Sequence, residues 1–97
     1  MENPLKIKIK IDRWKKTFPE YKDKIKWMVV SKANIYIREG ADLESPLMSR
    51  YLQQGEIIIA KDYEVNNWGQ IRIELDRGGW VSNIAGDGTE LMDIQIS

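Results

Sequence analysis

The sequence predicts a small all-β domain, and three observations support this class. Short runs rich in β-branched and aromatic residues recur along the chain, and turns containing glycine or asparagine separate them. Turn signals about every 8 to 12 residues are typical of an antiparallel barrel or sandwich. Several runs also alternate apolar with polar residues, which is the period of a half-buried strand. Because 97 residues suit one domain with its own core, we expect residues 1–97 to form a single domain.

The N-terminal extension, residues 1–32, predicts an added strand and a short helix. Apolar and lysine residues alternate over Pro4–Ile11, so one face of this strand is expected to be buried while the lysines protect an exposed edge. Because Pro19 suits only the start of a helix, the helix is expected over Glu20–Lys26. The spacing of one helical face is carried by Trp14, Phe18, Tyr21 and Ile25.

The central segment, residues 33–84, predicts a small antiparallel barrel of about five strands. Asp42, Ser45 and Pro46 favour turns over regular structure, so Gly40–Pro46 is expected to form the longest loop. Three consecutive isoleucines at 57–59 predict a strand covered on both faces. An apolar run at 27–31 precedes strands expected at 35–38, 48–52, 56–63, 68–75 and 80–81, and turns are expected at 53–55, 66–67 and 76–79.

The C-terminal segment, residues 85–97, predicts a glycine-rich loop followed by a final strand. Met92, Ile94 and Ile96 alternate with polar residues. The expected partner of this strand is Pro4–Ile11. Exposed strands at the ends of the sheet would also leave open a homodimer.

Composition weighs against an enzyme. The chain has no histidine and no cysteine, which removes the most common general base, the thiol nucleophile, disulfides and zinc sites built on these ligands. Asp87–Glu90 lacks the repeated acidic ligands of a calcium loop. We therefore expect no catalysis, no cofactor and no metal. Three acidic pairs remain, but each flanks a turn or lies on an outer strand face, where solvated charge is the more common role: Asp42/Glu44, Asp62/Glu64 and Glu74/Asp76.

Charge and hydropathy restrict the partners. Fifteen basic and fifteen acidic residues cancel, so no overall field favours nucleic acid or an anionic bilayer. No apolar run is long enough to span a membrane or to resemble a signal peptide. Localisation stays open, extracellular or at the cell wall for a fragment of a secreted protein and cytoplasmic otherwise. A solvated strand face explains the basic cluster better than a nucleic-acid site does, and that cluster consists of Lys6, Lys8, Lys10, Arg13, Lys15 and Lys16.

Aromatic residues next to turns are the best candidates for a binding surface. Small barrels tend to bind ligands across aromatic-lined grooves between loops, although a chain with one phenylalanine also needs tyrosine and tryptophan in its core. Both roles stay open for Tyr36, Tyr51, Tyr63, Trp68 and Trp80. Arg38 could pair with a carboxylate of the 40–46 loop or with one of a ligand.

Four motifs in the central segment resemble those of one family in order and spacing. They are Ile35-Tyr36-Ile37-Arg38-Glu39-Gly40-Ala41, Tyr51-Leu52-Gln53-Gln54-Gly55, Asn66-Asn67-Trp68 and Gly79-Trp80-Val81-Ser82. The region of about residues 33–84 resembles a bacterial SH3-like domain (Src homology 3, type b, or SH3b). Departures from the family pattern at Tyr36, Glu39, Ala41 and Gly69 fall partly in the loop that shapes the family's ligand groove.

The resemblance implies a non-catalytic module that recognises cell-wall peptide (peptidoglycan) and targets an associated protein. The groove is then expected to be built from Tyr36, Arg38, Asp42, Tyr63, Trp68 and Trp80. The alternative is an intracellular or phage-encoded adaptor for protein–protein interaction, with the N-terminal extension as its contact surface. Nucleic acid is the third and least favoured ligand.

Overall fold

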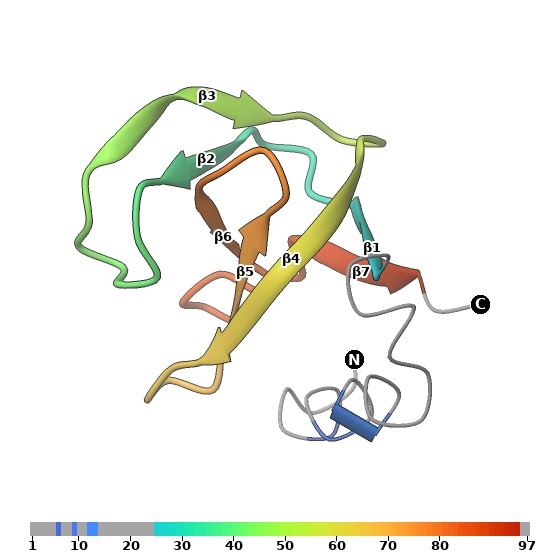
Figure 1. The fold of residues 1–97 in the computed structure, drawn as a ribbon. Coiled ribbons are helices and arrows are strands. Elements are labelled where there is room, and N and C mark those ends of the chain that lie inside the picture. The colour runs from blue at the N-terminus through green and yellow to red at the C-terminus, as the bar shows by residue number, and fades with distance from the viewer. Residues whose placement is uncertain (1–5, 7–8, 10–11, 14–24, 96–97) are drawn as a thin grey trace.

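The computed structural model describes Lys6, Ile9, Asp12, Arg13 and residues 25–95. Within these residues the chain forms a sheet of seven antiparallel strands in the order β3-β2-β6-β5-β4-β1-β7 (Figure 1). β3 and β7 stand at the two ends of this order, so the sheet is not a closed barrel. The predicted all-β class is confirmed. The strands are β1 (Lys26–Val29), β2 (Ile35–Arg38), β3 (Leu47–Leu52), β4 (Ile57–Val65), β5 (Ile71–Leu75), β6 (Trp80–Ser82) and β7 (Met92–Gln95).

The predicted strands of the central segment are confirmed, with shifts of one or two residues at several ends and a larger shift at the start of β5. β5 begins at Ile71 rather than at Trp68, because the Asn66 side chain holds residues 66–70 in a turn. Its Oδ1 accepts the backbone N–H groups of Trp68 and Gln70, each at 3.0 Å. Gly69 completes the turn with a φ of 77°, a left-handed angle that glycine adopts without strain.

β4 belongs to two groups of strands. Its first residues, Ile57–Ile59, pair with β1, while Ala60–Val65 pair with β5. The register shifts between Ala60 and Asp62, and such an irregularity bends a strand and increases its twist. Figure 1 shows the long β4 passing from the β5–β6 group to β1 and β7.

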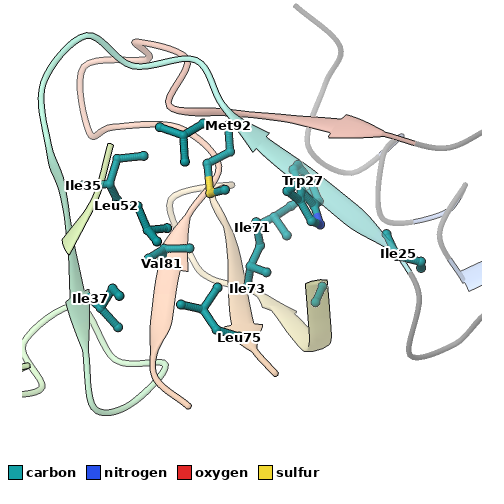
Figure 2. Packing of buried hydrophobic residues seen from close by; sticks show 12 residues of the cluster. Ile25, Trp27, Ile35, Ile37, Leu52, Ile71, Ile73, Leu75, Val81 and Met92 are labelled. Carbon is teal, nitrogen blue, oxygen red and sulfur yellow. The ribbon is translucent and has the colours of Figure 1, made fainter. Parts of the chain in front are cut away.

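The core lies between these two groups of strands. Alternation places Trp27 and Val29 of β1 inside. Ile71 and Ile73 of β5, from the other group, lie beside Trp27 (Figure 2). Trp27 keeps only 1% of its surface exposed, and burial of each such side chain contributes about 1.5–3 kcal/mol. The buried cluster comprises Ile25, Trp27, Val29, Ile35, Ile37, Leu52, Ala60, Ile71, Ile73, Leu75, Val81 and Met92.

Gly79 marks the closest approach of backbone to core in the β5–β6 turn. Its φ is 94°, which disfavours any residue with a Cβ. A Cβ at this position would overlap Ile37 Cγ2 and would lie 2.8 Å from Met48 Sδ. Both requirements explain the glycine before Trp80 without reference to any ligand.

Two expectations about the chain ends are wrong. Lys6 and Ile9 are helical rather than extended, as are Asp12 and Arg13, so Pro4–Ile11 is not a strand at its described positions. β7 pairs instead with β1 along its whole length. Alternating apolar and lysine residues satisfy a strand pattern, but β7 pairs with β1, whose Trp27 and Val29 are buried. Within the described part of the chain, no helix is long and apolar enough to cross a membrane.

The helix expected over residues 20–26 falls almost entirely outside the described residues. Its last residue, Lys26, begins β1, and Ile25 precedes that strand as a buried core residue. The last residue of the helical spacing, Ile25, therefore lies just before a strand.

The expectation that Ile57–Ile59 is covered on both faces is also wrong. Ile57 keeps 60% of its surface exposed, and its two neighbours are half-buried. At this part of β4 one edge of the strand pairs with β1. The three isoleucines line a groove, which leaves Ile57 largely exposed.

Candidate functional site

A row of side chains crosses the side of the sheet that faces away from the core. Arg38 on β2 pairs with Leu47 on β3 and with Trp80 on β6. Trp80 pairs in turn with Glu74 on β5, and Glu74 pairs with Asp62 on β4. Directly paired residues project to the same face of a sheet. These side chains therefore share one surface, which we call the outer face.

Tyr36 and Tyr51 form an exposed aromatic pair on the outer face. Tyr36 lies two positions before Arg38 on β2, so both side chains project outward. It pairs with Tyr51 on β3, and the two ring centroids lie 6.2 Å apart with an interplanar angle of 63°. Such edge-to-face pairs contribute about 0.5–1.5 kcal/mol. Because 59% of the Tyr36 surface remains exposed, its ring is available to a ligand.

The loop of residues 39–46 folds over the outer face and is held there by two arginines. Arg38 Nη1 donates to the Ser45 carbonyl at 2.7 Å, and Arg72 Nε donates to the Ala41 carbonyl at 2.8 Å. Within the loop, the Ser45 hydroxyl donates to the Gly40 carbonyl at 2.9 Å. The loop covers Arg72, which consequently keeps only 4% of its surface exposed although it lies on the outer side of β5.

A cavity of about 310 Å³ lies beside this loop, and we call it the loop pocket. Part of its wall comes from the β1–β2 connection and from Leu91. The polar side chains that line the loop pocket include two arginines and Ser82. Its apolar lining includes one leucine of the loop and one of β3. The main lining residues are Tyr36, Arg38, Leu43, Leu47, Arg72 and Ser82.

The loop pocket is electropositive. Burial lowers the pKa of the Arg72 guanidinium, and the neighbouring charge of Arg38 lowers it further. Asp42 acts in the opposite direction, but its exposed carboxylate accepts the Glu44 N–H at 2.8 Å. Two guanidinium groups thus lie close enough for the charge of Arg38 to act on Arg72, whose burial makes its own positive charge costly.

A second concavity, of about 580 Å³, separates β3 from the first half of β4, and we call it the open-edge groove. The two strands follow each other through the turn at residues 53–56, yet they do not pair. Arg50 of β3 lines the groove, and its Nη2 donates to the Gly78 carbonyl in the β5–β6 turn at 2.8 Å. One wall of the groove is apolar and includes exposed Ile57 together with Tyr51 and Leu75.

The structure gathers some of the predicted site residues and separates others. Tyr36 and Arg38 line the loop pocket, Asp42 lies in the loop beside it, and Trp80 pairs with Arg38 on the outer face. Trp68 lies in the turn at residues 66–70 with 74% of its surface exposed, and it lines neither concavity.

Tyr63 also lies apart from the loop pocket, on the second half of β4. Its hydroxyl donates to the carboxylate of Asp12. Partial burial, that hydrogen bond and the charges of Asp12 and Asp62 together raise the pKa of Tyr63 well above its usual range. The bond ties β4 to the described part of the N-terminal segment.

Sequence reasoning missed Arg72 and Ser82. Alternation with Ile71 and Ile73 marked Arg72 as a solvated residue of a strand's outer face. Its burial depends on carbonyl groups 31 and 32 positions earlier in the chain, which no local pattern reports. Tyr51 was a candidate for an aromatic binding surface but not one of the residues expected to build the groove, and Leu47 was not singled out.

No comparison with known proteins assigns a function. No protein-family model matches the chain, and no curated protein or solved structure is significantly similar to it. Among the described residues, no group of three or more acidic side chains could hold a metal ion. The functional groups that the structure places at the candidate site are exposed tyrosine rings, two guanidinium groups and serine hydroxyls, groups that are suited to stacking and hydrogen bonding.

Proposed function

We propose that the protein is a non-catalytic, SH3-like binding module that recognises peptide, with cell-wall peptide as the ligand class. The observation that carries this proposal is the exposed pair Tyr36–Tyr51, in which Tyr36 lines the loop pocket and Tyr51 lines the open-edge groove. Tyrosine supplies a large contact area with few rotatable bonds. Binding of a peptide there therefore costs little conformational entropy of the tyrosine side chains.

The SH3-like assignment rests on the strands between residues 33 and 84. β2 to β6 lie within that range, they follow one another with short turns, and the 39–46 loop is the longest connection among them. Gly79 and Trp80 occupy a turn and strand start for which the packing around Ile37 gives a physical reason. The motif resemblance covers the same range.

The ligand class follows from the resemblance together with the surface chemistry. Cell-wall peptides are short and extended and carry free carboxylates and amides. Aromatic rings on one strand pair and guanidinium groups next to them suit such a peptide, because the rings contact its apolar parts while arginine binds carboxylate in a fixed, planar geometry.

Sedimentation with insoluble peptidoglycan tests the proposal. The wild-type protein is expected to sediment in a saturable way at physiological salt, and Tyr36→Ala is expected to weaken binding at least about tenfold, or about 1.4 kcal/mol. Trp68→Ala is the matched control, because it removes an even more exposed aromatic side chain from a turn outside both concavities. Equal loss in both variants, or no saturable sedimentation of the wild type, would refute the proposal.

A second candidate, a protein–protein adaptor, is favoured by the open-edge groove. Exposed Ile57 lies on its wall, and β3 has an unpaired edge to which a partner strand can add. The same edge, or that of β7, would serve a homodimer. Ile57→Lys would abolish capture of a protein partner and leave sedimentation with peptidoglycan unchanged, and light scattering would report dimerisation.

A further inference from the structure

The guanidinium of Arg72 is buried against neutral acceptors only. It donates to the Ala41 carbonyl, to Ser82 Oγ at 2.8 Å and to the Gly40 carbonyl at 3.4 Å. A guanidinium has five N–H groups, so two Nη hydrogens keep no acceptor among the described residues. Arg72 keeps only 4% of its residue surface exposed, and a buried cation normally has a paired anion, because desolvation of an unpaired ion is costly.

Arg38 adds a second cation to the same cavity. It lines the loop pocket, and its one hydrogen bond to a described residue goes to the Ser45 carbonyl. Ser82 completes the polar set, because its oxygen accepts from Arg72 while its hydroxyl hydrogen has no acceptor within the described part of the chain and can donate. The site thus offers donors from three side chains around a space large enough for a small group.

We propose that the loop pocket binds a carboxylate, held by the Nη groups of Arg72, by Arg38 and by the Ser82 hydroxyl. Carboxylate is the anion whose two oxygens match the parallel N–H groups of a guanidinium. The apolar side chains of Leu43 and Leu47 line the same pocket, which suits a carboxylate attached to a small aliphatic group better than a free inorganic anion.

This inference rests on the proposed function and makes it more specific. A peptide that lies across Tyr36 and Tyr51 reaches the loop pocket with one end, since Tyr36 belongs to both surfaces. The anchoring group is then the C-terminal carboxylate of the peptide. Asp42 opposes the bound charge, because it is the carboxylate whose field reaches Arg72.

Titration with N-acetylalanine, followed by nuclear magnetic resonance, tests the carboxylate site in the wild-type protein. The Arg72 Nε–H signal and the backbone signals of Gly40 and Ser82 are expected to shift in a saturable way. The matched ligand N-acetylalaninamide has the same shape without the charge and is expected to leave them unchanged. Absence of a saturable shift, or equal shifts with the amide, would overturn the inference. Tighter binding of inorganic phosphate at the same signals would overturn the carboxylate assignment.

Two variants separate binding from folding. Arg38→Gln keeps a donor for the Ser45 carbonyl and is expected to weaken N-acetylalanine about tenfold. Asp42→Asn keeps an acceptor for the Glu44 N–H and is expected to strengthen it about twofold to fivefold, because a like charge is removed. Unchanged affinity in both would contradict the inference. Peptidoglycan sedimentation without carboxylate binding would refute this inference alone, and carboxylate binding without sedimentation would refute the proposed function alone.

Discussion

Arg38 and Trp80 stand directly opposite each other on β2 and β6, and theirs is the one register pair that joins these two strands. Arg38 also pairs with Leu47 and donates to the Ser45 carbonyl. One residue therefore connects the β2–β3 hairpin to β6 and holds the loop that covers the loop pocket. Arg38 is therefore a position at which stability and the proposed binding are expected to be coupled.

We expect Arg38→Ala to loosen the 39–46 loop more than it destabilises the protein. Loss of a charged donor to the Ser45 carbonyl costs about 1.5–3 kcal/mol locally. Hydrogen exchange of the Glu39 amide, which donates to the Pro46 carbonyl at 2.9 Å, should accelerate at least about tenfold. The amide of Ile73 in the core strand β5 serves as the control, and equal acceleration there would indicate global destabilisation instead.

Gly79→Ala should destabilise the fold much more than Gly78→Ala. Both glycines have a φ of 94°, so each substitution costs about 1 kcal/mol of backbone strain. Only at Gly79 does the new Cβ meet Ile37 and Met48, and such overpacking adds about 1–3 kcal/mol. Urea unfolding of both variants measures the difference. Equal losses would show that the close packing of Gly79 is not a constraint.

Ile57→Ala should leave stability nearly unchanged, within about 0.5 kcal/mol, because the side chain is largely exposed. Ile73→Ala should cost about 2–5 kcal/mol, since Ile73 has no exposed surface. The two substitutions remove the same atoms, so the comparison isolates burial. A large loss at Ile57 would mean that the open-edge groove is occupied in solution, for instance by a second copy.

Stability should fall in alkaline solution through Tyr63. Its pKa is raised in the folded protein above its ordinary value of 10.0, so the unfolded chain loses this proton first. The contribution is fully present below about pH 10 and is lost progressively as the pH rises above that value. The free energy of unfolding should therefore drop more steeply between about pH 9 and 11 for the wild type than for Tyr63→Phe. Parallel pH profiles would contradict this assignment.

Local patterns predicted the strands but not what covers them. Alternation and turn residues located β2 to β6, because these features act within a few residues of one another. The exposure of Ile57 depends on how β3 and β4 lie relative to each other, and the local sequence of neither strand can report that arrangement. Lys6 and Ile9 fit a strand pattern equally well, and their helical state shows that alternation alone does not commit a segment to a sheet.

The candidate site was predictable only in part for the same reason. Tyr36 and Arg38 stand next to a loop rich in turn residues, which marked them from the sequence. Arg72 became part of the site through contacts with carbonyl groups 31 and 32 positions away. Trp68 carried an equally strong sequence signal, but the Asn66 turn directs it away from both concavities.

The nine-residue strand β4 determines how cooperatively the protein unfolds. One end of this strand completes the β1–β7 side and the other completes the β5–β6 side, so neither side retains its core without it. Denaturant should consequently melt the described sheet in one step, with every probe reporting the same midpoint. A gene divided on either side of β4 would encode two pieces of which at least one stays unfolded until the other is supplied.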